Sequence, residues 1–348
     1  MRLHPSWGVI SIRGNWPLFP ARDVVVPHTR TMPDMLRILD VLVQDDPITR
    51  GDFWRRQDVV EVPAASSRRP PSYLGLTDPN ALQGRRLAVP AMYLGLDPDY
   101  PMAVRESVLA GWERARSRLK DLGAEVIVSD FPLISAIEAE RPGQKFIGKL
   151  GDLPPEWSQI EFGSFLAFGW DDFLRANGDP SIPDLRAVES REIYPPAPGA
   201  LPDRYERLGD QSDRFADTVD SARAGLEDPR SHPLFACGLR ALVALREELV
   251  YAWMRERGFD ALVLPANADV DEAAADLAWA NGVVFSHGNY ALRQVGLPTV
   301  TVPMGIMDDT RIPVGLTFAG PSGSDAALLG WAAAFDAESM RQPPALEA

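Results

Sequence analysis

Between residues 86 and 128 the apolar positions follow a strand pattern, then a helical pattern, then a strand pattern again. The run Arg86–Pro90 predicts a short strand, and Ala124–Val128 predicts a second one that is rich in branched residues. From Pro101 to Leu122 apolar residues recur every three or four positions, which predicts a helix with one buried stripe. Gly123 follows where a left-handed helix stop is expected. These short connections indicate a βαβ unit with two parallel strands.

The C-terminal part of the chain has the same kind of patterning. The elements that it predicts are, in order, a helix over Leu239–Trp253 ended by Gly258, a buried strand over Phe259–Leu264 ended by Pro265, strands over Pro298–Pro303 and Pro313–Ala319, and a last helix capped by Ser324 and Asp325. Alternating strands and helices of this length indicate an α/β fold.

The opening and the middle of the chain are less regular. The opening starts as a strand at Trp7, and the apolar stripe of Met35–Leu42 predicts a helix that Pro33 opens. Between Ser135 and Ser231 proline clusters and aromatic residues replace the regular pattern. We expect this segment, 135–231, to be an irregular helical insertion that lies over the sheet, where pockets are often completed. Its aromatic residues are expected mainly in the core.

Charge and composition exclude several classes of partner. The 348 residues carry a formal charge of −14, and 45% of them are hydrophobic, which is typical of a globular protein. The chain has no run of lysine and arginine, so nucleic acid and anionic membranes are not expected as partners. It also has no apolar run long enough to span a membrane and no signal peptide pattern at its start.

Cysteine and histidine usage points to a cytoplasmic protein without a metal site. The single cysteine, Cys237, cannot form an internal disulfide, and its apolar surroundings predict a small buried thiol. The four histidines are scattered and show no metal-binding spacing. The acidic run from Asp269 to Asp276 lacks the ligand spacing of a calcium loop, so a solvated helix start is the preferred interpretation.

Two blocks of residues carry a resemblance to a known family. The first is Gly8-Val-Ile-Ser11, Gly14, Pro17-Leu18, Pro20, Asp23, Pro27, Arg30-Thr31 and Asp34. The second is Phe259–Pro265, Asn289, Gly296-Leu-Pro298, Val302-Pro303, Gly305 and Pro313–Leu316 through Gly320. With these blocks the chain resembles the C-terminal part of an amidase signature enzyme. The resemblance implies one partial amidase-like domain over 1–348, an α/β fold with a mixed, largely parallel sheet covered by helices, and no N-terminal portion.

The resemblance also implies an activity, the hydrolysis of a carboxamide C–N bond through an acyl-serine. In the family a neutral lysine accepts a proton through a bridging serine, so that a second serine attacks the amide carbonyl without a metal or organic cofactor. Neither a Gly-Ser-Ser-Gly-like run nor a Gly-Ser-Ile-Arg-like run occurs in this sequence, and the pair Ser66-Ser67 is expected in a proline-flanked loop without glycine. We therefore assign no catalytic residue and expect the isolated chain to be inactive.

A smaller departure from the family pattern surrounds Asp23. The family's Asp-Thr-x-Gly-Pro stands here as Asp23-Val-Val-Val-Pro27, so branched side chains replace a hydroxyl and a glycine. The resemblance implies a buried acid at Asp23 that faces an arginine near the nucleophile, and that arginine is absent from the sequence. Asp23 is therefore expected to be buried without its partner or to reach solvent.

Six residues are candidates for binding a small-molecule amide. Leu264 and Pro265 end a buried strand, beyond which ligands bind in open α/β sheets, although a plain strand stop explains them equally well. The resemblance places the segment before Gly296-Leu-Pro298 beside the substrate, which adds His287, Asn289, Gly296 and Pro298. Asn289 is suited either to orienting an amide or to capping a turn.

Two other classes of function stand beside the amidase interpretation. A noncatalytic, truncated relative would bind a small amide or a protein partner without cleaving anything. An unrelated α/β hydrolase would need a Gly-x-Ser-x-Gly elbow, which the sequence lacks. The sequence determines neither the particular amide nor the oligomeric state.

Overall fold

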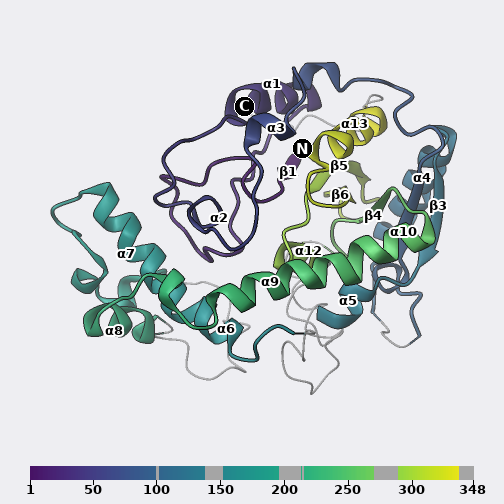
Figure 1. Ribbon diagram of the computed structural model, residues 1–348. Coiled ribbons are helices and arrows are strands. Elements are labelled where there is room, and N and C mark those ends of the chain that lie inside the picture. The colour runs from purple at the N-terminus through teal and green to yellow at the C-terminus, as the bar shows by residue number, and fades with distance from the viewer. Residues whose placement is uncertain (99–101, 138–151, 196–212, 214, 270–288, 337–348) are drawn as a thin grey trace, which may run out of the picture.

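The computed structural model describes the chain except for residues 99–101, 138–151, 196–212, 214, 270–288 and 337–348 (Figure 1). At the centre of the described part lies a six-stranded sheet in the order β1-β5-β6-β4-β2-β3. Its strands are β1 (Arg2–His4), β2 (Arg86–Pro90), β3 (Glu125–Ser129), β4 (Ala261–Pro265), β5 (Thr299–Ile306) and β6 (Pro313–Ala319).

The directions of the strands confirm a mixed sheet. Strand β2 pairs in parallel with both β3 and β4, so the predicted βαβ unit is present. Strands β4 and β6, β6 and β5, and β5 and β1 pair antiparallel. Four of the six strands in the described sheet therefore point one way, and β1 and β6 point the other way.

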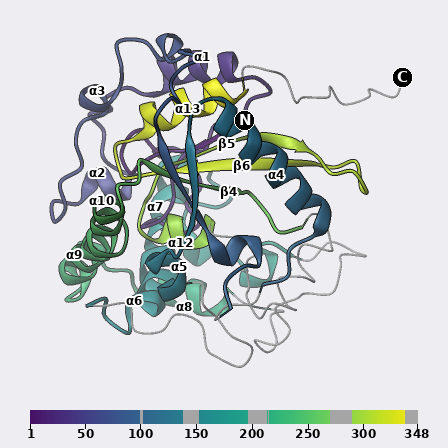
Figure 2. The same cartoon turned by 90° about the vertical axis from the view of Figure 1, so that its right-hand side faces the viewer.

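Helices cover both faces of this sheet (Figure 2). The described α-helices are α1 (Met32–Leu42), α2 (Phe53–Arg56), α3 (Ala65–Arg68), α4 (Glu106–Asp121), α5 (Pro132–Ile137), α6 (Trp157–Ile160), α7 (Leu166–Asn177), α8 (Ala216–Ala224), α9 (Phe235–Arg246), α10 (Trp253–Arg257), α12 (Asn289–Gln294) and α13 (Asp325–Asp336). Successive side chains of a strand point to opposite faces of the sheet, so the sheet separates two cores. On one face, Leu87 of β2 and Val263 of β4 are buried together with residues of α1, α4 and α13. The same strands bury Ala88 and Leu262 against α5, α10 and α12.

Helices α6, α7 and α8 extend to one side of the sheet, at the left of Figure 1, and are called the side group of helices below. Helices α6 and α7 are joined by a π-helical turn, Glu161–Phe165, and a second π-helical turn, Glu247–Ala252, joins α9 to α10. Trp157 and Phe165 share a buried aromatic cluster with Trp7 of the first loop and Trp54 of α2. This cluster connects the side group of helices to the first sixty residues.

The structure corrects the prediction of a strand that starts at Trp7. The first strand lies at Arg2–His4, and the chain turns at Gly8, whose φ is +77°. A Cβ at Gly8 would lie 2.2 Å from Cγ1 of Val62, so the close approach of this loop also requires glycine. Because the chain turns here, Trp7 stacks on Trp54 with ring centroids 3.7 Å apart instead of continuing a strand.

Two further expectations are wrong. Cys237 is exposed, because α9 buries its neighbours Gly238 and Leu239 on the opposite side. Ser66 and Ser67 lie in the one-turn helix α3 and not in a loop, and both are exposed. Among the described residues no helix has the length and apolar character needed to cross a membrane.

A buried carboxylate ties the two ends of the described chain together. The N–H and hydroxyl of Ser6 donate to the two carboxylate oxygens of Asp325, at 2.8 and 2.6 Å. The N–H of Gly323 donates in turn to the Ser6 hydroxyl at 2.8 Å. Burial raises the pKa of Asp325, and the hydrogen bonds from Ser6 oppose that shift.

Replacing Asp325 with alanine is expected to lower the free energy of unfolding by about 2 kcal/mol, because the N–H and hydroxyl of Ser6 lose their acceptors inside the protein. Asp325→Asn keeps an acceptor for the Ser6 N–H, and its cost should be about half as large. Urea denaturation followed by tryptophan fluorescence measures both values. Equal stability of the wild type and Asp325→Ala would contradict this role.

Candidate functional site

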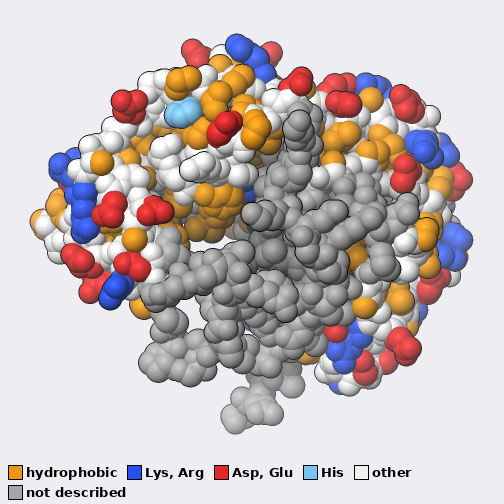
Figure 3. Space-filling view, turned by 90° about the horizontal axis from the view of Figure 1, so that it is seen from below, with side chains coloured by type: hydrophobic (Ala, Val, Ile, Leu, Met, Phe, Trp, Pro, Cys, Tyr) orange, Lys and Arg blue, Asp and Glu red, His pale blue; other side chains and the backbone are white. Residues whose placement is uncertain are grey.

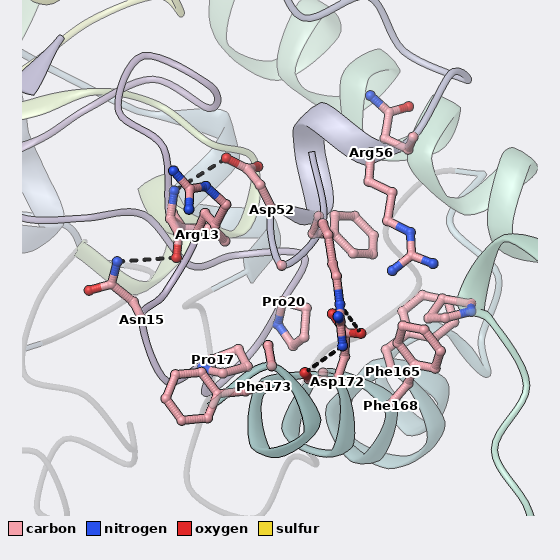
Figure 4. Close-up of a pocket in the computed structure, with 18 of the residues that line it drawn as sticks. Arg13, Asn15, Pro17, Pro20, Asp52, Arg56, Phe165, Phe168, Asp172 and Phe173 are labelled. Carbon is pink, nitrogen blue, oxygen red and sulfur yellow. Dashed lines mark hydrogen bonds and ion pairs between the residues drawn. The ribbon is translucent and has the colours of Figure 1, made fainter. Parts of the chain in front are cut away.

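A cavity of about 440 Å³ opens between the N-terminal loops and the side group of helices (Figure 4). Its lining residues come from four stretches of the chain, which lie within residues 12–20, 48–57, 165–177 and 228–235. Its volume lies in the range of small-molecule pockets. From below, hydrophobic side chains gather around a hollow in the surface of the molecule (Figure 3).

The inner wall of the cavity is aromatic. The Phe53 ring lies 6.1 Å from Phe165 and 5.7 Å from Phe235, and the last two rings are 5.8 Å apart. Phe168 and Phe173 of α7 are only half-buried and also line the cavity. A ligand with an apolar or aromatic body would cover these exposed ring surfaces.

Ion pairs across the cavity hold its walls together. Arg50 donates from Nε to Asp172 Oδ1 at 3.0 Å, which joins the loop before α2 to α7 (Figure 4). Arg56 at the end of α2 donates to Asp228 Oδ2 at 2.7 Å, and Arg230 donates to both oxygens of the same carboxylate. These contacts fix the position of α2 relative to the side group of helices.

Asp52 explains why the sequence folds into a helix at this wall. Its side chain caps α2 by accepting from the Arg55 N–H at 3.2 Å. Its other oxygen accepts from the Ile12 N–H at 3.2 Å, which attaches the N-terminal loop to the same helix. Burial raises the pKa of Asp52, and the backbone donors oppose that shift. Asp52 therefore has a structural role although it lines the cavity.

A buried ion pair lies close to this wall. Arg22 pairs with Glu161, the first residue of the π-helical turn before α7, and both side chains are buried. The Arg22 guanidinium also lies over the rings of Phe19 and Phe162, at 5.7 and 5.0 Å from their centroids. The extra residue of a π-turn is common at functional sites. Here the turn contributes Glu161 to the pair.

Asp23, next to Arg22, is held by the backbone. Its Oδ2 accepts from the N–H groups of Leu18 and Phe19 at 2.6 and 2.9 Å. Burial raises the pKa of Asp23 to about 6, against the lowering effect of these two donors. Glu161 raises this pKa further and Arg293 lowers it. Asp23 is thus a partly buried carboxyl with two backbone donors.

A second titratable group, His4 in β1, is more deeply buried. Burial together with the positive charges of Arg2 and Arg293 lowers the pKa of His4 to about 3. Its Nδ1 has no hydrogen-bond partner among the described residues. The charge of Arg293 lowers the pKa of both His4 and Asp23.

The cavity does not include the substrate-binding residues predicted from the sequence. Leu264 and Pro265 are buried at the end of β4, and Pro298 is buried just before β5. Gly296 packs against Trp7, and Asn289 begins α12. His287 lies outside the described residues, as does the rest of the acidic run after Asp269. Asp269 itself pairs with Arg105 at 2.8 Å.

The described residues do not bring a lysine and two serines together. Lys120 is exposed in the last turn of α4, and the Ser67 hydroxyl donates to the carbonyl of Ala64. No group of three metal-binding side chains occurs in the part of the chain that the structure describes. The described residues therefore form a binding cavity without a nucleophile relay.

Sequence reasoning missed this cavity. The residues that build it are separated by more than a hundred positions, as in the ion pair of Arg50 with Asp172. The available signal was local, since Pro17 and Pro20 belong to the first block of the family resemblance and both line the cavity. The aromatic residues of segment 135–231 were a second signal, because Phe168 and Phe173 line the cavity.

Comparisons with known proteins support the resemblance. No protein family profile matches the chain. A mitochondrial glutamyl-tRNA(Gln) amidotransferase subunit of Mycosarcoma maydis is 23% identical, over 94% of this chain and 58% of the relative. The native peptide amidase of Stenotrophomonas maltophilia has a TM-score of 0.62 at 21% identity, over 99% of this chain and 60% of that structure.

A bacterial aryl acylamidase of the amidase signature enzymes has a TM-score of 0.50 at 16% identity, over 97% of this chain and 58% of that structure. The chain therefore spans about three fifths of the length of the relatives that it matches. Over that span, this chain has the fold of the amidase signature enzymes.

Proposed function

We propose that this chain is the substrate-binding part of an amidase signature hydrolase, which cleaves a carboxamide to a carboxylic acid and an amine or ammonia. The observation that carries the proposal is the shared fold, which covers 97 to 99% of the chain in amidase structures. The cavity beside α7 supports it, because its aromatic wall suits an apolar acyl group. In this proposal segment 135–231 is the insertion that completes the cavity.

The chemistry in this proposal uses residues outside this sequence. A neutral lysine takes a proton through a bridging serine while the second serine attacks the amide carbonyl carbon. The C–N bond then breaks, the amine leaves with a proton, and water hydrolyses the acyl-serine. The described residues contribute by binding the acyl group and excluding water from it. We propose a cytoplasmic location and a reaction without a metal or organic cofactor.

A second function rests on the cavity alone, which the described residues form without a nucleophile relay. In that case the chain binds a small amide or a protein partner and cleaves nothing. The two functions differ in the mass of the protein in its native cells. A mass well above 38.2 kDa together with amide hydrolysis supports the amidase, whereas a product of 38.2 kDa without hydrolysis supports the binding protein.

The purified 348-residue chain is expected to show no turnover of an aryl anilide and no labelling by a fluorophosphonate, because it holds no nucleophile relay. Release of the aniline, followed by absorbance, measures the first quantity, and intact mass after labelling measures the second. Turnover that the fluorophosphonate abolishes would overturn the assignment of catalysis to residues outside the chain.

A further inference from the structure

Arg56 is a cation of the cavity that retains capacity to bind a ligand. A guanidinium has five N–H donors, and Arg56 donates from Nη2 to Asp228. Among the described residues, Nε and Nη1 of Arg56 have no hydrogen-bond partner. Its side chain is 27% exposed and lines the cavity, so these donors are accessible to a bound molecule.

The other charges around Arg56 are already compensated. Asp228 also accepts from Arg230 at 3.1 and 2.8 Å, so its negative charge is shared by two arginines. Arg50 uses Nε and Nη2 for the side chain and carbonyl of Asp172. The residues that line the cavity include four arginines and three aspartates, and Asp58 also acts on Arg230, within a chain whose formal charge is −14.

The surroundings of Arg56 are apolar on its other side. Its guanidinium lies 5.3 Å from the centroid of the Phe168 ring, which fixes the plane of the cation. Phe165 lies near Arg56 in Figure 4, and Phe235 also lines the cavity. A ligand bound here would meet a cation beside exposed aromatic surface, and a hydrogen bond between a cation and an anion is stronger than one between neutral groups.

We infer that the cavity binds molecules with an aromatic or apolar body and a carboxylate, and that Arg56 receives the carboxylate. The inference rests on the proposed function and specifies its substrates as amides that also carry a carboxylate, such as N-acyl amino acids. Arg56 is then a residue that determines specificity, and Phe168 packs on the body of the ligand.

Hippurate and its uncharged counterpart hippuramide are suitable probes, because they share the benzoyl group and differ at the carboxylate. Titration calorimetry with the 348-residue chain should give a dissociation constant for hippurate that is lower than that for hippuramide by a factor of about 10 or more. The measurement requires no turnover, so it remains informative when the chain is inactive. Loss of the preference with hydrolysis intact in a longer protein would refute this inference alone.

The variant Arg56→Gln should remove the preference for hippurate and leave the binding of hippuramide nearly unchanged. Asp228 keeps its two hydrogen bonds from Arg230 in this variant, so no buried charge is left without a partner. Arg56→Lys retains the charge and should restore part of the preference. Phe168→Ala should weaken both ligands alike.

The matched control is Arg37→Gln, which removes an exposed arginine of α1 that pairs with Asp34 at 3.2 Å outside the cavity. It should bind both probes as the wild type does. Three outcomes would overturn the inference: equal affinity for the two probes, retention of the preference in Arg56→Gln, or no saturable binding of hippurate up to about 10 mM.

Discussion

Replacing Gly296 with alanine is expected to destabilise the protein by about 4 kcal/mol, because two costs add at this position. Its φ of +66° lies in the left-handed region, which alanine adopts poorly. Its Cβ would also lie 2.1 Å from Cε2 of Trp7. Trp7 has little room to move, since it stacks on Trp54 and lies under the Arg246 guanidinium, 5.2 Å from its ring. Thermal and urea denaturation measure the loss.

Gly330 in α13 is the matched control, because a Cβ there meets no atom within 4 Å. Gly330→Ala should stabilise the protein by about 0.5 to 1 kcal/mol through the helix propensity of alanine. Where Gly296→Ala does not fold, the double variant with Trp7→Leu should recover part of the stability, since it removes the overlap but not the strained φ. A fully stable Gly296→Ala would show that Trp7 does not occupy this position.

The second large effect concerns the free energy of unfolding between pH 4 and 6.5, on which His4 and Asp23 are expected to act in opposite directions. The pKa of His4 falls from 6.5 in the unfolded chain to about 3 in the folded protein. The contribution of His4 to the free energy of unfolding is therefore fully present above pH 6.5. It is lost as the pH falls, by about 3 kcal/mol at pH 4. The pKa of Asp23 is raised to about 6, so its stabilisation is complete below pH 3.8 and is lost as the pH rises through 6.

Single variants separate these two contributions. His4→Asn should make the protein gain stability relative to the wild type as the pH falls from 6.5 to 4, because the histidine no longer binds a proton on unfolding. Asp23→Asn should have the opposite effect, so that the protein loses stability more steeply than the wild type as the pH falls. The free energy of unfolding in urea at each pH gives the curves.

The control for the pH series is His28→Asn, which removes an exposed histidine. It shows whether the removal of a histidine outside β1 changes the curve. Parallel curves for His4→Asn and the wild type would refute the burial of a neutral histidine in β1. The comparison of variants is decisive, because other carboxyls contribute equally to every curve.

Elements with strong local patterns were predicted well. Strands β2 and β6 have the predicted bounds, and β3 is displaced by one residue. Gly123 and Gly258 end their helices with φ values of +87° and +67°, as the sequence indicated. In each case the nearest neighbours in the chain decide the structure, and a short window of sequence contains that information.

Elements that depend on distant partners were missed. Strand β1 has only three residues and forms because Leu3 pairs with Val300, almost three hundred positions away. Cys237 looked buried because its neighbours are apolar, yet α9 turns it toward solvent. The cavity has the same origin, since Arg56 and Asp228 become neighbours only in the folded protein.

The tie between Ser6 and Asp325 has a consequence for biosynthesis. The two residues are 319 positions apart, and β1 likewise waits for β5. At the usual rate of translation, roughly 15 to 60 s pass between the synthesis of Ser6 and that of its partner. Trp7 can meet Trp54 early, but its contacts with Arg246 and Gly296 form only late in this interval. The segment around Ser6 and Trp7 therefore lacks part of its packing, and chaperones can bind it until α13 leaves the ribosome.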